Sequence, residues 1–218
     1  MQKDNDYSRE NDLQEKFNQF WESIFDDKKD YFKNLSTEKL IELKKAVHDI
    51  NNIITLRVTN QFVDLLYEEK LISSSQAKRI KEAIDKQHPN TNGFDICFTR
   101  DSGHPDDMNI IAEIKCNIVP KDKKSYDANQ FDSIISDIQH LLNNKGTSQI
   151  SNESINDYFK FMVLLNGENV ADAIDNLMER VGKNINKYSE INGKLRVYSG
   201  KNINLQKDVV YIVPIDLK

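Results

Sequence analysis

The segment 93–120 constrains the fold most, because it places ionisable residues inside two apolar, strand-like runs. The runs cover 94–98 and 110–116, and both are rich in residues that favour β-strands. The residues between them are rich in Asp, Gly and Pro, a composition typical of turns. The sequence therefore predicts a β-hairpin here.

Three ionisable residues lie in this hairpin: Asp95 in the first run, and Glu113 and Lys115 in the second. Side chains alternate between the faces of a strand, so Glu113 and Lys115 share one face, and Asp95 on the paired strand can approach it. Charges in apolar strands are costly unless they are paired or bind a metal ion. Two carboxylates and a lysine suit Mg²⁺-assisted hydrolysis of a phosphodiester. A surface salt bridge between Glu113 and Lys115 is the alternative interpretation.

Asp95, followed after a loop by Glu113-Ile114-Lys115 in an apolar strand, resembles the PD-(D/E)xK nuclease superfamily, which includes most type II restriction endonucleases. Phe94 stands where the family usually has proline. The resemblance implies that Asp95, Glu113 and the backbone carbonyl of Ile114 bind a metal ion. It implies that Lys115 orients the attacking water, and that the cofactor is Mg²⁺, for which Mn²⁺ can substitute.

Further residues are expected to serve the same site. In the resembled fold a preceding helix often adds an acidic residue. Glu68 and Glu69 are candidates, but a solvated helix face explains them at least as well, so Glu69 is left out of the site. The basic residues in loops after or beyond the catalytic strand are expected to contact DNA phosphates, and these are Lys121, Lys123, Lys124 and Arg196. The net charge of −5 is not typical of a non-specific nucleic-acid binder, but the distribution of charge matters more than its sum.

Helical periodicity dominates the first third of the chain. Apolar residues recur at helical spacing in 13–25 and again in 40–71, where a break near Asn51-Asn52 is expected. We predict a helical N-terminal region, 1–86, used for packing or dimerisation and including a core helix, and a nuclease core, 87–218.

Alternating helical and apolar segments continue through that core, with helices expected in 131–142 and 170–181 and strands in 158–165 and 209–213. This order fits the α/β (α+β) class. The resemblance implies a restriction-endonuclease-like fold, in which helices flank a mixed central sheet.

The composition is that of a soluble protein, with 38% hydrophobic residues and a mean hydropathy of −0.66. No apolar run approaches the roughly 20 residues of a membrane span, and the polar N-terminus lacks a signal-peptide core. We therefore expect a cytoplasmic protein without a membrane partner. Its two cysteines, Cys97 and Cys116, are expected to be small buried thiols rather than a disulfide.

The expected function is that of a Mg²⁺-dependent endodeoxyribonuclease, most like a type II restriction endonuclease of a restriction-modification pair. Such an enzyme would cut double-stranded DNA as a homodimer, because two-fold symmetry matches a palindromic site. Two alternatives stay open. One is a defence or repair nuclease without sequence specificity, and the other is a non-catalytic binding module.

Overall fold

A computed structural model describes residues 8–33, 35–86, 93–144, 150, 154–200 and 204–217. The chain divides into two compact units, Met1–Ile50 and Asn51–Lys218. The long helix α2 contains the junction, so its two halves are described with their own units. No helix among the described residues is long and apolar enough to cross a membrane.

The first unit contains helix α1 (Arg9–Phe25), as the apolar spacing predicts. Ser8 caps it, because its hydroxyl accepts a hydrogen bond from the backbone N–H of Asn11 at 3.3 Å. Aromatic side chains of α1 pack on the loop that follows. The ring of Trp21 stacks on that of Phe25 and also lies beside Tyr31, with centroids 5.4 and 6.4 Å apart.

Helix α2 (Thr37–Glu68) is continuous, so the break expected near Asn51-Asn52 is absent and that prediction was wrong. Asparagine costs a helix interior only about 0.7 kcal/mol relative to alanine, far less than the roughly 3 kcal/mol of proline. The helix begins after Ser36, whose hydroxyl accepts from the backbone N–H of Lys39. It ends before Lys70, which adopts a left-handed conformation with φ 59°.

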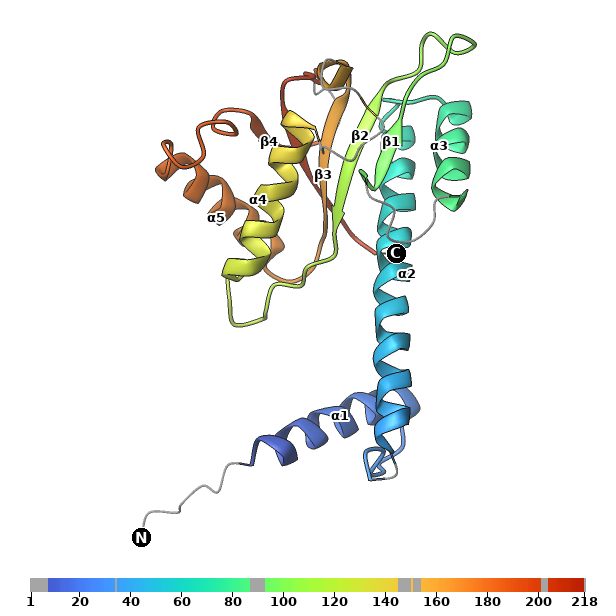
Figure 1. The fold of residues 1–218 in the computed structure, drawn as a ribbon, viewed down its shortest axis with the longest axis vertical. Coiled ribbons are helices and arrows are strands. Elements are labelled where there is room, and N and C mark those ends of the chain that lie inside the picture. Colours follow the sequence, from blue (N-terminus) through green and yellow to red (C-terminus); the bar gives the residue numbers. More distant parts are fainter. Residues whose placement is uncertain are drawn as a thin grey trace. The chain divides into compact units, whose positions relative to one another are not determined.

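The second unit is built on a mixed five-stranded sheet, seen nearly edge-on in Figure 1. Its spatial order is β1-β2-β3-β5-β4; β1 pairs antiparallel with β2, and the other pairs are parallel. The strands are β1 (Ile96–Phe98), β2 (Ile110–Lys115), β3 (Phe159–Leu165), β4 (Leu195–Val197) and β5 (Val210–Ile215). This arrangement confirms the expected mixed sheet of the α/β class.

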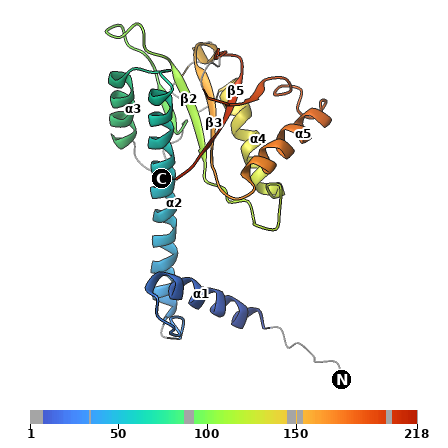
Figure 2. The same ribbon diagram turned by 180° about the vertical axis from the view of Figure 1, so that it is seen from behind.

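Helices cover both faces of this sheet (Figures 1 and 2). Helices α4 (Ala128–Asn143) and α5 (Val170–Lys183) lie on one face, with side chains such as Ile134 and Leu177 in the core. The C-terminal half of α2 and helix α3 (Ser74–Lys86) lie on the other, where Phe62 is fully buried. A 3₁₀ turn, η1 (Ser154–Asp157), precedes β3.

The second unit begins at Asn51, within the helical region 1–86 that the sequence expected to include a core helix. Residues of α2 and α3 such as Val58, Leu66 and Ile80 share a core with strand residues, which makes them part of the sheet's own packing. Strand β4 was not anticipated. It is three residues long and carries the charged Arg196, as expected of a short edge strand.

Candidate active site

The β1–β2 hairpin forms as predicted, with Ile96 opposite Ala112 and Phe98 opposite Ile110. Regular backbone pairing of β1 with β2 starts only at Ile96, because before it a side-chain carboxylate takes the place of a backbone acceptor. Oδ2 of Asp95 accepts a hydrogen bond from the backbone N–H of Ile114 at 2.7 Å. The Asp95 carboxylate is thus anchored to the strand that carries the other two predicted site residues.

Glu113 and Lys115 leave β2 on the face covered by α4 and α5. Their neighbour Ile111, two residues before Glu113, belongs to that core, while Ala112 and Ile114 belong to the core on the opposite face. Glu113 is only 4% exposed. The structure therefore places Asp95, Glu113 and Lys115 at the same end of one hairpin, and the Glu113 carboxylate is buried.

Lys115 has a partner that the sequence analysis missed. Its Nζ lies 2.7 Å from Oδ2 of Asp137 on α4, and the two side chains are 24% and 13% exposed. Nδ1 of His140, one helical turn further on, lies 3.8 Å from Oδ1 of Asp137. A signal existed in the pattern, because Asp137 falls three residues after Ile134 and thus on the edge of the buried stripe of α4.

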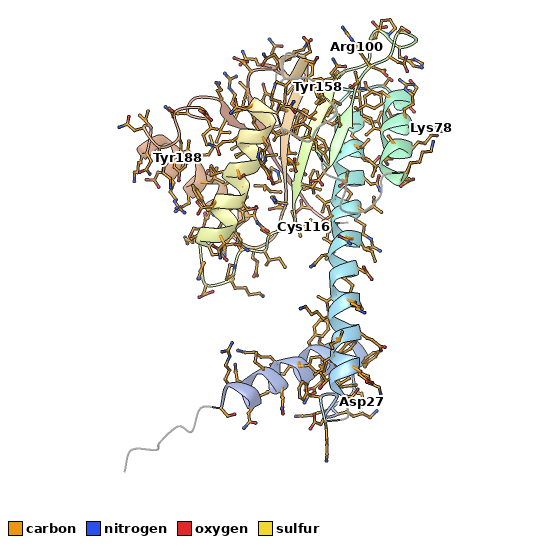
Figure 3. The ribbon with its side chains drawn as sticks, viewed as in Figure 1. Asp27, Lys78, Arg100, Cys116, Tyr158 and Tyr188 are labelled. Carbon is orange, nitrogen blue, oxygen red and sulfur yellow. The ribbon has the colours of Figure 1, made fainter. Side chains whose placement is uncertain are left out.

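A second missed neighbour is Cys116, which Figure 3 labels at the end of β2 beside α2. Its Sγ lies 3.6 Å from the hydroxyl of Thr55 on α2. Burial and the nearby carboxylate of Asp95 raise the pKa of the Cys116 thiol, and the contact with Thr55 partly opposes them. Both cysteines are free thiols, as predicted, but neither is fully buried: Cys97 is exposed and Cys116 is partly buried.

The ligand atoms that these residues offer are oxygens, the type that Mg²⁺ prefers. In a β-strand the N–H and C=O of one residue point to the same neighbour, so the carbonyl of Ile114 is directed to the edge where Asp95 binds its N–H. Among the described residues no three His, Cys, Asp or Glu side chains cluster tightly enough to hold a metal ion. Mg²⁺ does not require three, because it commonly uses one or two carboxylates together with water and phosphate.

Glu69 lies far from the end of β2 that carries Glu113 and Lys115. It is next to Tyr198, whose pKa is raised by burial and by the Glu69 carboxylate, just beyond the edge strand β4. From Thr55, which contacts the end of β2, to Glu69 the helix advances about 21 Å at 1.5 Å per residue. Glu69 therefore does not join Asp95 and Glu113.

The four basic residues expected to contact DNA occupy two separate places. Lys121, Lys123 and Lys124 are exposed in the loop after β2, where Lys121 lies 3.3 Å from Glu168 and Lys124 3.4 Å from Asp172. Arg196 lies on β4, at the opposite side of the sheet. Three strand spacings, about 14 Å, separate β4 from β2.

A small hollow lies between that loop and the carboxyl ends of β2 and β3. Its volume is about 150 Å³, and its lining includes Asn117, Ile118, Lys121 and Asn166. Ligands of parallel sheets commonly bind at this edge.

Comparison with known proteins assigns no relative: the chain matches no protein-family model, no curated protein and no solved structure.

Proposed function

We propose that this protein is a metal-dependent endonuclease that hydrolyses DNA phosphodiester bonds with Asp95, Glu113 and Lys115. The hydrogen bond from Ile114 to Asp95 carries the proposal, because it fixes the Asp95 carboxylate beside the strand that bears the other two residues. Glu113 is buried in the same hairpin, and buried carboxylates are either paired or coordinate metal ions. The likeness of these residues to the PD-(D/E)xK pattern supports the same assignment.

Each residue has a distinct role in this proposal. The carboxylates of Asp95 and Glu113, with the Ile114 carbonyl, would hold Mg²⁺ or Mn²⁺, which supplies Lewis-acid stabilisation of the charge that develops on the phosphate. Lys115 donates hydrogen bonds, and an ammonium group near the scissile phosphate would orient the attacking water. The helices on both faces of β2 limit the access of bulk water to these groups.

The substrate in this proposal is double-stranded DNA, and the enzyme type is a type II restriction endonuclease acting as a homodimer in the cytoplasm. Lys121, Lys123 and Lys124 would contact the phosphate backbone from the loop after β2, and Arg196 would contact it from the far edge of the sheet. Lys121 and Lys124 already face Glu168 and Asp172, so binding DNA would exchange those exposed ion pairs for phosphate contacts.

A second candidate function is that of a non-catalytic interaction protein. Exposed apolar side chains on the N-terminal helices favour it, since Phe20, Phe25 and Ile50 are each at least half exposed. The hairpin charges would then be a structural cluster, and no divalent metal ion would matter.

Cleavage assays with the purified protein separate these functions. Supercoiled plasmid and phage DNA would be incubated with Mg²⁺, Mn²⁺, Ca²⁺ or a chelator, with Glu113→Gln as a control that preserves side-chain shape. We expect cleavage with Mg²⁺ and Mn²⁺ only, and none by the variant. Ca²⁺ should not support efficient cleavage, because its longer and more flexible coordination positions water less well.

The pattern of products identifies the nuclease type. Discrete bands would support a restriction endonuclease, and a smear would support a nuclease without sequence specificity. No metal-dependent cleavage of any substrate would contradict the nuclease proposal and leave the interaction protein.

A further inference from the structure

We propose that Asp137 is a positioning residue that holds the ammonium group of Lys115 for the reaction. This inference rests on the proposed function and adds a residue that no part of the sequence pattern assigns to the site. The observation behind it is the 2.7 Å contact between Nζ of Lys115 and Oδ2 of Asp137.

Lys115 needs such a partner because its side chain is long and flexible. A lysine loses about 2 kcal/mol of rotamer entropy when it is fixed in one position. The contact with Asp137 is three-quarters or more shielded from solvent on both sides, so salt screens it less than a surface pair. Without Asp137, the same ammonium group could turn toward other acceptors or toward solvent.

Asp137 is itself held on a rigid element. Its neighbours Ile134 and Ile138 are fully buried, and the N-terminus of α4 is fixed by a capping box between Asp127 and Gln130. Groups that position catalytic side chains act best when packing fixes their own place. The packing of α4 on the core thus fixes the position of Asp137, and Asp137 in turn holds the ammonium group of Lys115.

The stability of the fold does not by itself explain this ion pair. Helix α4 already buries six apolar residues against the sheet, and a buried ion pair often contributes no more than apolar side chains of similar size. The arrangement is therefore better explained by orientation of Lys115. Nδ1 of His140 lies 3.8 Å from Asp137, beyond hydrogen-bond distance, so His140 is not needed for this role.

The test compares Asp137→Asn and Asp137→Leu with the matched control Asp132→Leu, an exposed position on the same helix. The first variant keeps an oxygen acceptor without the charge, and the second removes the acceptor. Thermal melts establish that each variant is folded. Because the Asn variant preserves the shape of the side chain, it serves if the Leu variant does not fold.

One measurement is independent of catalysis. Metal-free protein is treated with an acetylating reagent, and modification of Lys115 is quantified by mass spectrometry against exposed Lys123 in the same molecule. We expect modification of Lys115 to rise several-fold in Asp137→Leu and to a smaller extent in Asp137→Asn. The Asp132→Leu control should match the wild type.

The second measurement separates the chemical step from binding. Single-turnover cleavage at saturating DNA should slow by about 10- to 100-fold in Asp137→Leu, since small displacements of a catalytic group have effects of this size. Asp137→Asn should retain more of the wild-type rate than Asp137→Leu. The affinity for DNA, measured in Ca²⁺, should stay within about twofold of the wild type, because Asp137 does not contribute to ground-state binding of DNA.

The outcomes distinguish this inference from the function on which it rests. Unchanged modification of Lys115 and a wild-type cleavage rate in both Asp137 variants would overturn the role of Asp137 alone. A wild-type protein that cleaves no DNA would overturn the proposed function and the catalytic role of Asp137 together, even if Lys115 became more reactive.

Discussion

Lys160 is a charged residue at the centre of the sheet, only 1% exposed, and its ammonium group is held by backbone carbonyls. Nζ donates to the carbonyl of Ile155 at 2.9 Å, to that of Tyr158 at 3.1 Å and to that of Lys207. The side chain thus ties η1 to the turn before β5. Burial lowers the pKa of Lys160 from 10.5 to about 8, because it disfavours the charged form.

This shift predicts how stability depends on pH. Between pH 8 and 10.5 the unfolded chain keeps the lysine proton while the folded protein loses it, so the free energy of unfolding rises with pH in that window. The rise has an upper limit of about 3 kcal/mol, at 1.36 kcal/mol per unit. Below pH 8 both states are protonated and this contribution is constant.

Chemical denaturation of the wild type and Lys160→Met at several pH values tests the prediction. The stability of the wild type relative to the variant should increase from pH 8 to 10, whereas Lys123→Met should run parallel to the wild type. Tyr126, whose pKa burial raises to about 12, opposes the rise above pH 10, but it is present in every protein and cancels in the difference. A constant difference would contradict the account.

At the residue scale, the sequence predicted the site in part. Asp95, Glu113 and Lys115 stand out because charges are rare in apolar strands, and the structure places them at one hairpin. The partner of Lys115 could not be predicted, because the contact with Asp137 joins segments separated by a loop and depends on how α4 packs. Local patterns carry no information about such packing.

At the scale of elements, helix α2 is the clearest candidate for an interface. In its N-terminal half Val47 is 49% and Ile50 is 50% exposed, on a helix whose apolar residues Leu40, Leu43, Val47, Ile50 and Ile54 alternate at spacings of three and four. That alternation is the heptad pattern of helices that pair with other helices. We predict that a second copy of the chain covers this stripe.

Sedimentation velocity at micromolar concentration tests this prediction. The wild type should sediment as a dimer, and Ile50→Asp should shift it to a monomer, because a charge in an apolar seam is costly. Lys45→Asp on the same helix is the matched control and should remain dimeric. A monomeric wild type, both free and bound to DNA, would contradict the expected homodimer.

Helices and strands were predictable from the sequence where they contain a long run or stripe of apolar residues. The helices with buried stripes and strands β2, β3 and β5 appear close to their expected ranges. Strand β4 has three residues and one charge, too little for a pattern to indicate. Strand β1 starts later than expected because the Asp95 side chain, not the backbone, binds the N–H of Ile114.

At the scale of the whole molecule, the sheet brings distant parts of the chain to one place. The hairpin carries the carboxylates, α4 supplies the partner of Lys115, and α2 contacts the end of β2 through Thr55. Because β2 pairs in parallel with β3, the carboxyl ends of both strands lie at the same edge of the sheet, and Lys115 lies there with them. The central proposal for this arrangement is that Asp95, Glu113 and Lys115 would form one metal-dependent hydrolytic site.

Single-turnover DNA cleavage by Asp95→Ala, Glu113→Ala and Lys115→Ala is the most direct test of that proposal, with exposed Asp132→Ala as the control. We predict that each site variant folds but loses at least about 100-fold in rate, because each removes stabilisation of the transition state. Lys115→Ala should still bind Mn²⁺, whereas the two carboxylate variants should bind it weakly. Near-wild-type cleavage by folded Glu113→Ala or Lys115→Ala would contradict the assignment.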